Sequence, residues 1–436
     1  MLKRFKFKNA YSFLGETELS MEANYGMKDH VDFIRDVGKD GMNEYLLPVA
    51  AIFGANAGGK SNVIQALLDC AMNICGRSTS VELDSFFPGR SLKNRTFALA
   101  KKPASSFEHE LTLVLKGNEY SYRYVSTGRE VISESLDHKQ AGSNGKPNNI
   151  LTRDTEKNHF VLNIDHIDNS DIKRFICDLS QKRKDILIAN MMGSIGIEPF
   201  ASISNWCGSV LFVTQISSEG ERTNSLSRLA AWAEEDASHK KRLSEFISKF
   251  DEAIRYVDVK VSDDQILLET DKKASKSKTR TKQFQLQLAH NARENASALF
   301  PIHWESAGTR KLLELFLPLF NALEFGRPLV YDELDVMLHP LVFLRLVAMF
   351  NDPEDNPYNA QLVFAAHDTV VMTREHLRRD EIHIVDKNEF GESTICRFSD
   401  YEDQGGKKIR KDAQYNKLYF DGILGPVHDS FFEAKV

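Results

Sequence analysis

The chain has 436 residues, of which 42% are apolar and 27% are charged, and its formal net charge is −6. This is the composition of a soluble globular protein, and the acidic balance excludes a globally basic nucleic-acid binder while allowing a local basic patch. Because one hydrophobic core rarely serves more than roughly 300 residues, we expect two or three domains, or one domain interrupted by an insertion.

The beginning of the chain, residues 1–8, alternates basic and apolar residues and lacks the continuous apolar stretch of a secretory signal. No apolar run approaches the roughly 18–20 residues of a membrane helix. The five cysteines are scattered, without the spacing of a zinc site: Cys70, Cys75, Cys177, Cys207 and Cys396. We therefore expect a cytoplasmic protein with free thiols and no membrane contact.

Apolar–polar alternation marks five strand-like segments in the first third of the chain: residues 2–8, 16–21, 107–115, 119–125 and 131–136. The first two predict an opening hairpin, and the next two predict a hairpin around Lys116-Gly117-Asn118. Together they predict an antiparallel β subdomain.

The stretch Gly54–Ser61 matches the phosphate-binding motif G-x-x-x-x-G-K-[ST] at every fixed position. A strand-like run, residues 46–53, precedes it and helical spacing, residues 62–69, follows it, which is the context that the motif needs. Lys60 should reach the β- and γ-phosphates, and the Ser61 hydroxyl should bind Mg²⁺. The alternative is a chance glycine-rich turn before a helix. The predicted nucleotide-binding residues are Gly54, Asn56, Gly58, Gly59, Lys60, Ser61 and Asn62.

The central segment, residues 138–283, contains no recognisable motif and is mainly helical in pattern. Apolar residues have helical spacing at residues 172–179, 226–233 and 243–250. Residues 256–268 alternate apolar and polar residues as a strand does. The run 271–282 carries six positive charges and no apolar anchor. It predicts a solvated, mobile loop, and a contact with nucleic-acid phosphates is the alternative.

Asp332 and Glu333 follow the strand-like run Leu329–Tyr331. In phosphoryl-transfer sites of this class the carboxylate at the strand end holds Mg²⁺, and the next carboxylate is placed to polarise an attacking water. We assign these roles to Asp332 and Glu333. The alternative is a pair of acids that cap a surface strand.

Three further elements surround this pair in the sequence. Ser306 and Gly308 stand at the start of a helix-like segment and predict a second anion site. Asp335 follows the carboxylates almost directly. His367 ends a buried-strand pattern further along, where a histidine that senses the γ-phosphate is expected.

These motifs resemble, in their order along the chain and in their residues, the Walker A, signature, Walker B, D-loop and H-loop set of ABC-type head ATPases. The resemblance includes the stretches D-E-L-D-V-M-L-H-P and E-S-A-G-T-R-K. They are most similar to the RecF/OLD/SMC-like branch, and within it to the RloA-like and abortive-infection ATPases of bacterial anti-phage systems. The resemblance implies an α/β fold, an ABC-type P-loop NTPase head with an N-terminal antiparallel β subdomain and a mainly helical insertion. The implied segments are residues 1–137 and 284–436 for the two halves of the head, and 138–283 for the insertion with its basic loop.

The same resemblance implies an ATPase in which two heads sandwich two ATP molecules with Mg²⁺. Ser306 and Gly308 of one subunit would close on the γ-phosphate held by Lys60 of the other, and Asp335 would run along the dimer interface. The signature reads Ser-Ala-Gly-Thr instead of Ser-Gly-Gly-Gln, and no Q-loop glutamine stands between residues 80 and 100. The implied catalytic residues are Glu333, His367 and Lys60, and the implied metal ligands are Ser61 and Asp332.

We therefore predict a homodimeric or larger ATPase that acts as a nucleotide-driven switch or scaffold for a separate effector in anti-phage defence. Because few residues follow Asp400, we expect no TOPRIM nuclease domain in this chain and any nuclease activity to come from a partner. The resemblance to RloA-like ATPases implies that this partner is a small TOPRIM-like nuclease. The main alternative is a RecF-like DNA-repair ATPase that contacts DNA through the basic segments 77–102 and 272–282. A transporter ATPase is disfavoured by the unusual signature and by the long separation between Lys60 and Asp332.

Overall fold

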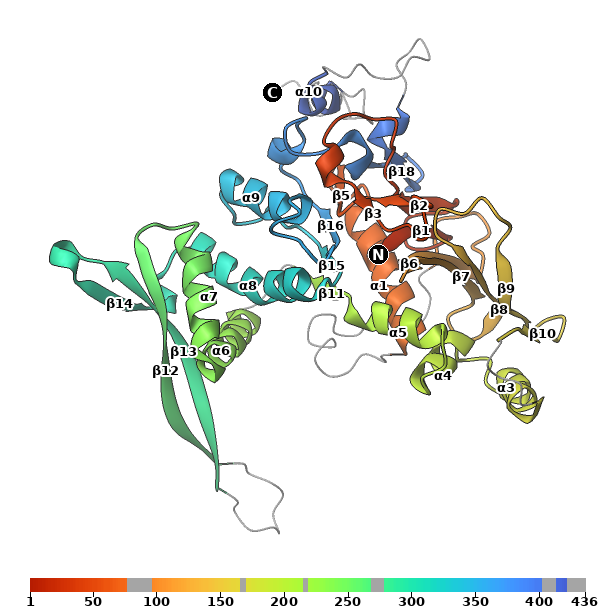
Figure 1. The fold of residues 1–436 in the computed structure, drawn as a ribbon, viewed down its shortest axis with the longest axis horizontal. Coiled ribbons are helices and arrows are strands. Elements are labelled where there is room, and N and C mark those ends of the chain that lie inside the picture. The colour runs from red at the N-terminus through yellow and green to blue at the C-terminus, as the bar shows by residue number, and fades with distance from the viewer. Residues whose placement is uncertain (77–95, 165–169, 215–218, 268–277, 402–412, 422–436) are drawn as a thin grey trace. The chain divides into compact units, whose positions relative to one another are not determined.

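The computed structural model of the chain describes residues 1–76, 96–164, 170–214, 219–267, 278–401 and 413–421 (Figure 1). They form two compact units. The first unit holds the described residues within 1–214, 322–334 and 343–436, and the second holds those within 215–321 and 335–342. The predicted division of the sequence at residues 138 and 283 stays a prediction. Among these described segments, no helix has the length and apolar character needed to cross a membrane.

One sheet of the first unit has seven antiparallel strands in the order β10-β9-β8-β7-β6-β1-β2. Their bounds are β1 Leu2–Lys8, β2 Thr17–Ser20, β6 Phe107–Leu115, β7 Asn118–Ser126, β8 Val131–Gln140, β9 Asn148–Asp154 and β10 His159–Leu162. Both predicted pairings, β1 with β2 and β6 with β7, are confirmed. Lys116 and Gly117 have positive φ, 52° and 75°, which suits the twist of a tight hairpin loop.

A second sheet of the first unit has six strands in the order β11-β15-β16-β5-β17-β18. Their bounds are β5 Val49–Gly54, β11 Leu211–Val213, β15 Leu329–Tyr331, β16 Leu362–Ala365, β17 Ile382–Lys387 and β18 Ser393–Arg397. The strands from β11 to β17 pair in parallel, and β18 closes the edge in antiparallel pairing. Every residue of β5 is buried, as expected for a central strand covered on both faces. Because the carboxyl ends of parallel strands meet at one edge, the residues that follow β5, β15 and β16 come together there.

Helix α1 (Lys60–Cys75) joins the cores of the two sheets. Leu67 and Ala71 of α1 share one hydrophobic cluster with Phe5 and Leu111 of the antiparallel sheet and with Val363 of the parallel sheet. This packing fixes the helix that begins inside the phosphate-binding motif. Further elements are β3 Arg35–Asp36, β4 Tyr45–Leu46, α3 Ser170–Lys182, α4 Ile188–Ser194, α5 Phe200–Ser209, α9 Pro340–Asn351 and α10 Tyr415–Phe420.

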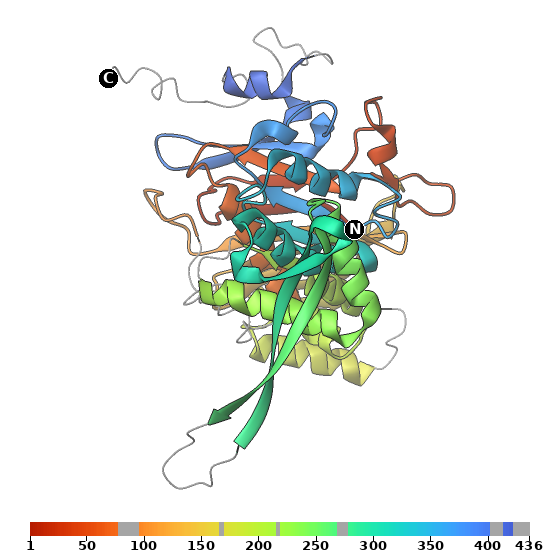
Figure 2. The same ribbon diagram turned by 90° about the vertical axis from the view of Figure 1, so that its left-hand side faces the viewer.

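The second unit combines helices with a long two-stranded ribbon, which is visible in Figures 1 and 2. Its elements are α6 Glu219–Glu235, α7 Ala237–Ser248, β12 Ile254–Leu267, β13 Lys278–Asn291, β14 Ser297–Pro301 and α8 Ala307–Phe325. The end of α8, from Ala322 onward, belongs to the first unit. The core of the second unit includes Leu229 of α6, Leu243 of α7, Leu288 of β13 and Phe316 of α8.

The predicted solvated loop at residues 271–282 is wrong for its C-terminal part. Lys278–Lys282 begin β13 and pair with β12, with Lys282 opposite Asp263. Residues 271–277 lie outside the described residues. The charge run indicated exposure to water, but exposure does not prevent a segment from pairing its backbone with a distant strand.

Candidate nucleotide-binding site

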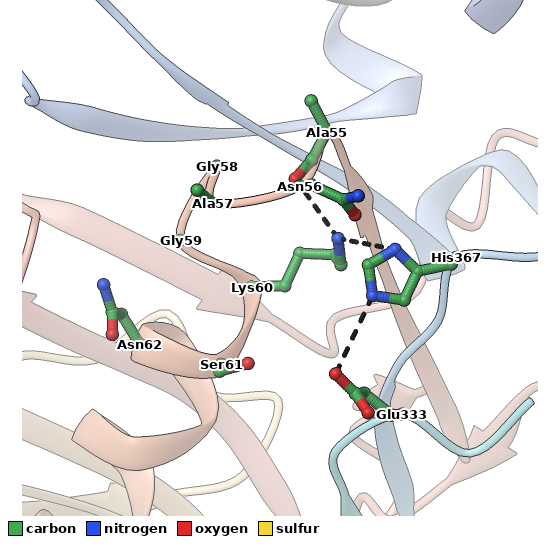
Figure 3. A pocket seen from close by; sticks show the side chains of 10 residues that line it. All are labelled: Ala55, Asn56, Ala57, Gly58, Gly59, Lys60, Ser61, Asn62, Glu333 and His367. Carbon is green, nitrogen blue, oxygen red and sulfur yellow. Dashed lines mark hydrogen bonds and ion pairs between the residues drawn. The ribbon is translucent and has the colours of Figure 1, made fainter. Parts of the chain in front are cut away.

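The phosphate-binding motif forms the loop between β5 and α1, and this loop lines a pocket of about 470 Å³ (Figure 3). Gly54 begins the turn with φ 155°, and a Cβ there would lie 2.2 Å from the Val385 carbonyl oxygen, so glycine is required. Gly59 precedes α1 and provides no side-chain cap, which leaves the first amides of the helix for an anion. The residues that line the pocket are Ala55, Asn56, Ala57, Gly58, Gly59, Lys60, Ser61, Asn62, Glu333 and His367.

The Lys60 side chain is buried, with 6% of the residue exposed, and folds back over its own loop. Its Nζ donates to the Gly54 carbonyl at 2.8 Å and to the Ala55 carbonyl at 3.3 Å. It also lies 3.4 Å from His367 Nδ1. These contacts hold the ammonium beside the loop amides, so its charge and the amide dipoles act on the same ligand.

Glu333 and His367 follow the ends of β15 and β16 and lie with Lys60 in one pocket (Figure 3). Glu333 Oε1 is 3.9 Å from His367 Nε2, and the two side chains remain 32% and 41% exposed. The backbone of Glu333 is left-handed, with φ 61°, a conformation that costs a non-glycine residue about 1 kcal/mol or more and is concentrated at functional sites. The structure therefore brings together the three residues to which the sequence assigned catalysis.

Asp332 lies beside Ser61, whose hydroxyl donates a hydrogen bond to the Asp332 carboxylate. Burial raises the pKa of Asp332, and the Ser61 hydrogen bond and the nearby Lys60 charge oppose that rise. In the described part of the chain, Asp332 Oδ1 is buried and has no hydrogen-bond partner. A buried carboxylate oxygen that lacks a partner, next to a hydroxyl, suits Mg²⁺, which takes oxygen ligands. Ser61 and Asp332 are therefore the residues that would hold the metal.

We expect Asp332→Asn to lower the affinity for Mg²⁺ in the presence of ATP by roughly 10- to 100-fold, because the amide keeps the shape of the carboxylate and loses its charge. Since burial raises the pKa of Asp332, protons should compete with the metal at a higher pH than for an ordinary aspartate. Wild-type affinity for Mg²⁺ should therefore fall on acidification, and the Asn variant should not share that dependence. Mg²⁺ titrations of ATP binding at several pH values measure both effects, and an unchanged Mg²⁺ affinity in the variant would contradict the assignment.

Ser306, Gly308 and Asp335 belong to the second unit, whereas the residues that line the pocket belong to the first. Ser306 caps α8, because its Oγ accepts a hydrogen bond from Thr309 N at 3.0 Å. Gly308 lies close to the segment after Asp335, since a Cβ on it would be 3.4 Å from the Met337 carbonyl oxygen. The predicted signature and D-loop residues therefore form a local arrangement of their own.

Sequence reasoning missed two residues that lie against the phosphate-binding loop, Ser12 and Ser393. A Cβ on Gly59 would come within 2.7 Å of Ser393 Oγ and within 3.0 Å of Ser12 Oγ. Neither serine stands in a motif, so no local pattern could have identified it. The basic segment predicted at 77–102, and the search for a Q-loop residue, fall largely on residues 77–95, which lie outside the described residues.

The phosphate-binding loop after β5, the carboxylates after β15 and the histidine after β16 define an ABC-type P-loop NTPase head with an antiparallel β subdomain and helical insertions. The model of the family described as "AAA domain, putative AbiEii toxin, Type IV TA system" matches residues 49–373. This is well over half of the chain, and the chain belongs to this family. The predicted ABC-type head is thereby confirmed in the coarser form of an AAA/ABC-type ATPase head, and the narrower resemblance to RloA-like ATPases stays a prediction.

The chain is also similar to solved structures of SMC heads. A crystal structure of an SMC head bound to the C-winged helix domain of ScpA is 15% identical, with 91% of this chain and 96% of that chain covered and a TM-score of 0.44. An SMC head domain from Thermotoga maritima is 16% identical in sequence to this chain, with 91% of this chain and 98% of that chain covered and a TM-score of 0.41. No curated protein matches the chain.

Proposed function

We propose that this chain binds ATP with Mg²⁺ and hydrolyses it. The observation that carries the proposal is the convergence of Lys60, Glu333 and His367 in one pocket at the carboxyl ends of neighbouring parallel strands. Ser61 and Asp332 add oxygen donors for a metal beside the same loop. Phosphate binding, charge neutralisation and a carboxylate for the attacking water are the parts that phosphoryl transfer to water requires.

In this mechanism the loop amides and Lys60 bind and orient the phosphate chain. Mg²⁺, held by Ser61 and Asp332, would neutralise charge on the phosphate oxygens. The Glu333 carboxylate accepts a hydrogen bond from the attacking water and aligns it with the γ-phosphorus. His367 lies between the lysine and the carboxylate, 3.4 Å from Lys60 Nζ and 3.9 Å from Glu333 Oε1, where it can contact the γ-phosphate and report its presence to both.

Hydrolysis in a pair of chains is the second part of the proposal. Among the residues that the structure describes, those that line the pocket belong to the first unit, and Ser306 and Gly308 stand at the N-terminus of α8 in the second unit, where helix amides favour an anion. A second copy would supply these residues to the γ-phosphate, as the resemblance to ABC-type heads implies. ATP would then act as a switch between separate and paired heads.

Ser306→Arg should lower ATP hydrolysis by roughly 100-fold or more, because the bulky cation blocks closure of the second copy on the γ-phosphate. ATP binding to the isolated chain should change little, since the binding pocket belongs to the other unit. Phosphate release and nucleotide titration measure the two quantities. Ser306→Ala is the matched control: it removes the helix cap without adding bulk, so it separates a loss of local stability from a block of closure. Normal hydrolysis by Ser306→Arg would contradict the assignment of the signature.

We further propose that the paired heads switch or scaffold a separate effector in bacterial anti-phage defence. The family description names a putative toxin of a type IV toxin–antitoxin system, which supports a role in a toxin-based system. The switch, the separate effector and the link to phage defence rest on the sequence resemblance. A TOPRIM-like nuclease is the effector that the sequence resemblance favours.

Affinity purification of tagged Glu333→Gln in ATP, from cells that carry the neighbouring genes, tests the effector. A stoichiometric small protein without nucleic acid is the expected result, and tagged Lys60→Ala should fail to retain it. Co-purification of nucleic acid without a protein partner would favour the RecF-like repair function instead.

A further inference from the structure

The turn between β1 and β2 has an unusual backbone and is fixed by side chains. Asn9 and Tyr11 both have left-handed φ, 52° and 56°, which is rare for a bulky residue such as tyrosine. The Asn9 amide donates to the Ser106 carbonyl at 2.6 Å, and the Tyr11 hydroxyl donates a hydrogen bond to the Asp69 carboxylate on α1. These anchors compensate for the strain and hold the turn against the helix that begins in the phosphate-binding loop.

The turn places Ser12 in a chain of hydrogen bonds that ends on the loop itself. Asn62 Nδ2 donates to Ser12 Oγ at 2.7 Å, the two serine hydroxyls are 2.7 Å apart, and Ser393 Oγ donates to the Gly58 carbonyl at 2.6 Å. The backbone strengthens the link, because Ser393 N donates to the Ser12 carbonyl at 2.7 Å. Ser393 is the first residue of β18 and is only 4% exposed, so its bond to the Gly58 carbonyl is buried, whereas the bonds that involve Ser12 are partly buried.

The Ser393 hydroxyl is the donor that reaches the loop. The Gly58 carbonyl can only accept, and Ser393 Oγ lies 2.6 Å from it and 2.7 Å from Ser12 Oγ, so its one hydrogen faces both acceptors. Ser12 Oγ also accepts from the Asn62 amide. Ser12 thereby holds the Ser393 side chain beside the Gly58 carbonyl, and hydrogen bonds in such a network polarise one another.

The last bond of the chain determines where a phosphate-binding amide points. In a trans peptide the carbonyl and the following N–H lie on opposite sides. A Gly58 carbonyl held outward by Ser393 therefore directs the Gly59 N–H to the other side, into the pocket that these two glycines line. The two hydroxyls also close the space behind Gly59, where a Cβ would come within 2.7 Å of one of them.

We propose that Ser12 and Ser393 are positioning residues that hold the Gly58–Gly59 peptide with its N–H directed at the phosphate chain of the nucleotide. The inference rests on the proposed binding of ATP and names the groups that set its affinity. The hydrogen bonds of Ser12 and Ser393 act on the loop amides that bind the inner phosphates, so the affinities for ADP and for ATP should depend on them equally. Because the contacts of these amides with the phosphates exist both before and during hydrolysis, loss of the serine hydrogen bonds should raise KM and leave kcat nearly unchanged.

The test compares Ser393→Ala, Ser12→Ala and the double variant with the wild-type chain. We expect the Kd for ATP and for ADP, and the KM for ATP, to rise by roughly three- to tenfold in Ser393→Ala, the effect of one lost hydrogen bond. The double variant should be no worse than Ser393→Ala, because Ser12 acts through Ser393. Ser12→Thr, which keeps the hydroxyl, should restore the affinity that Ser12→Ala loses.

A matched control separates positioning from loss of stability. Ser399 is also buried, and its hydroxyl donates to Asp400 Oδ1 at 3.0 Å, away from the loop. Ser399→Ala should lower the melting temperature of the nucleotide-free protein to a similar degree and leave both Kd values unchanged. The proposal is overturned if the wild type binds ATP while Ser393→Ala binds within about twofold of it, or if Ser399→Ala shows the same loss. A wild-type chain that binds neither ATP nor ADP overturns the proposed function together with this inference.

Discussion

Lys60→Ala should abolish measurable ATP hydrolysis and weaken ATP binding by at least roughly 100-fold. The Lys60 side chain is buried, and its Nζ atom is held by the Gly54 and Ala55 carbonyls at 2.8 and 3.3 Å. The side chain is therefore ordered before the nucleotide binds, and little conformational entropy is lost on binding. Its removal takes the positive charge of the lysine out of the pocket and frees two carbonyl oxygens that would repel an anion. Titration with a fluorescent ATP analogue and a phosphate-release assay measure the two losses.

Two companion variants make the Lys60 experiment specific. Lys157→Ala removes a lysine whose side chain is 81% exposed and whose partner is Asp154, so binding and hydrolysis should stay at the wild-type level. Lys60→Arg keeps the charge, but a planar guanidinium does not fit the position of a compact ammonium between two carbonyls, and hydrolysis should remain strongly reduced. Wild-type hydrolysis by Lys60→Ala would mean that the loop is a glycine-rich turn without a role in catalysis.

The features of this molecule that could be predicted from the sequence are those with a short-range pattern. The alternation in residues 2–8 and 107–115 predicted β1 and β6, since a half-buried strand repeats every second residue. The buried run before Gly54 predicted β5, because a strand covered on both faces is apolar throughout. The motifs, through their resemblance to ABC-type heads, predicted one site for Lys60, Glu333 and His367, and parallel strands, which place their carboxyl ends at one edge, explain why these residues meet.

The parts that could not be predicted depend on contacts between distant residues. Ser12 and Ser393 are separated by 381 positions in the chain, and serine occurs on any exposed surface, so neither carries a local signal. Lys278–Lys282 were predicted as a loop because their composition suits water, but the pairing partner that makes them a strand stands in β12. The left-handed backbones of Glu333 and Met337 were also not predictable, since glycine is the residue that normally indicates such positions.

The path of the chain after β15 links the proposed catalytic carboxylate, Glu333, to the proposed D-loop residue, Asp335. Leu334 belongs to the first unit, and its backbone N–H donates to the Ala365 carbonyl at 3.1 Å, next to the strand that ends at His367. Asp335 is the next residue and belongs to the second unit. Leu334 is the one residue between Glu333 and Asp335, so a displacement of the segment that begins at Asp335 acts on the position of Glu333 through two peptide groups. This connection gives a direct route by which closure of paired heads would align the attacking water.

Glu333→Gln should retain ATP binding and lower hydrolysis by roughly 100- to 1,000-fold, the usual contribution of a positioned general base. Glutamine has the size of glutamate and can adopt the same left-handed backbone with a similar penalty, so the pocket should keep its shape. The amide can still form a hydrogen bond with water, but it cannot accept the proton that water must lose. Binding should persist because Lys60 and the loop amides, which hold the phosphates, are unchanged.

The same variant should stabilise the paired state, because ATP that is not hydrolysed keeps the heads together. Light scattering after size-exclusion chromatography should show a dimer of Glu333→Gln in ATP and Mg²⁺, and a monomer in ADP. Adding Lys60→Ala to the same chain should abolish the dimer, which separates nucleotide-driven pairing from aggregation. Glu389→Gln, an exposed carboxylate in the turn between β17 and β18, serves as the charge-matched control and should behave as the wild type. Hydrolysis by Glu333→Gln at the wild-type rate would assign the base to another residue, whereas slow hydrolysis without a dimer would retain Glu333 as the base and remove the need for a second copy.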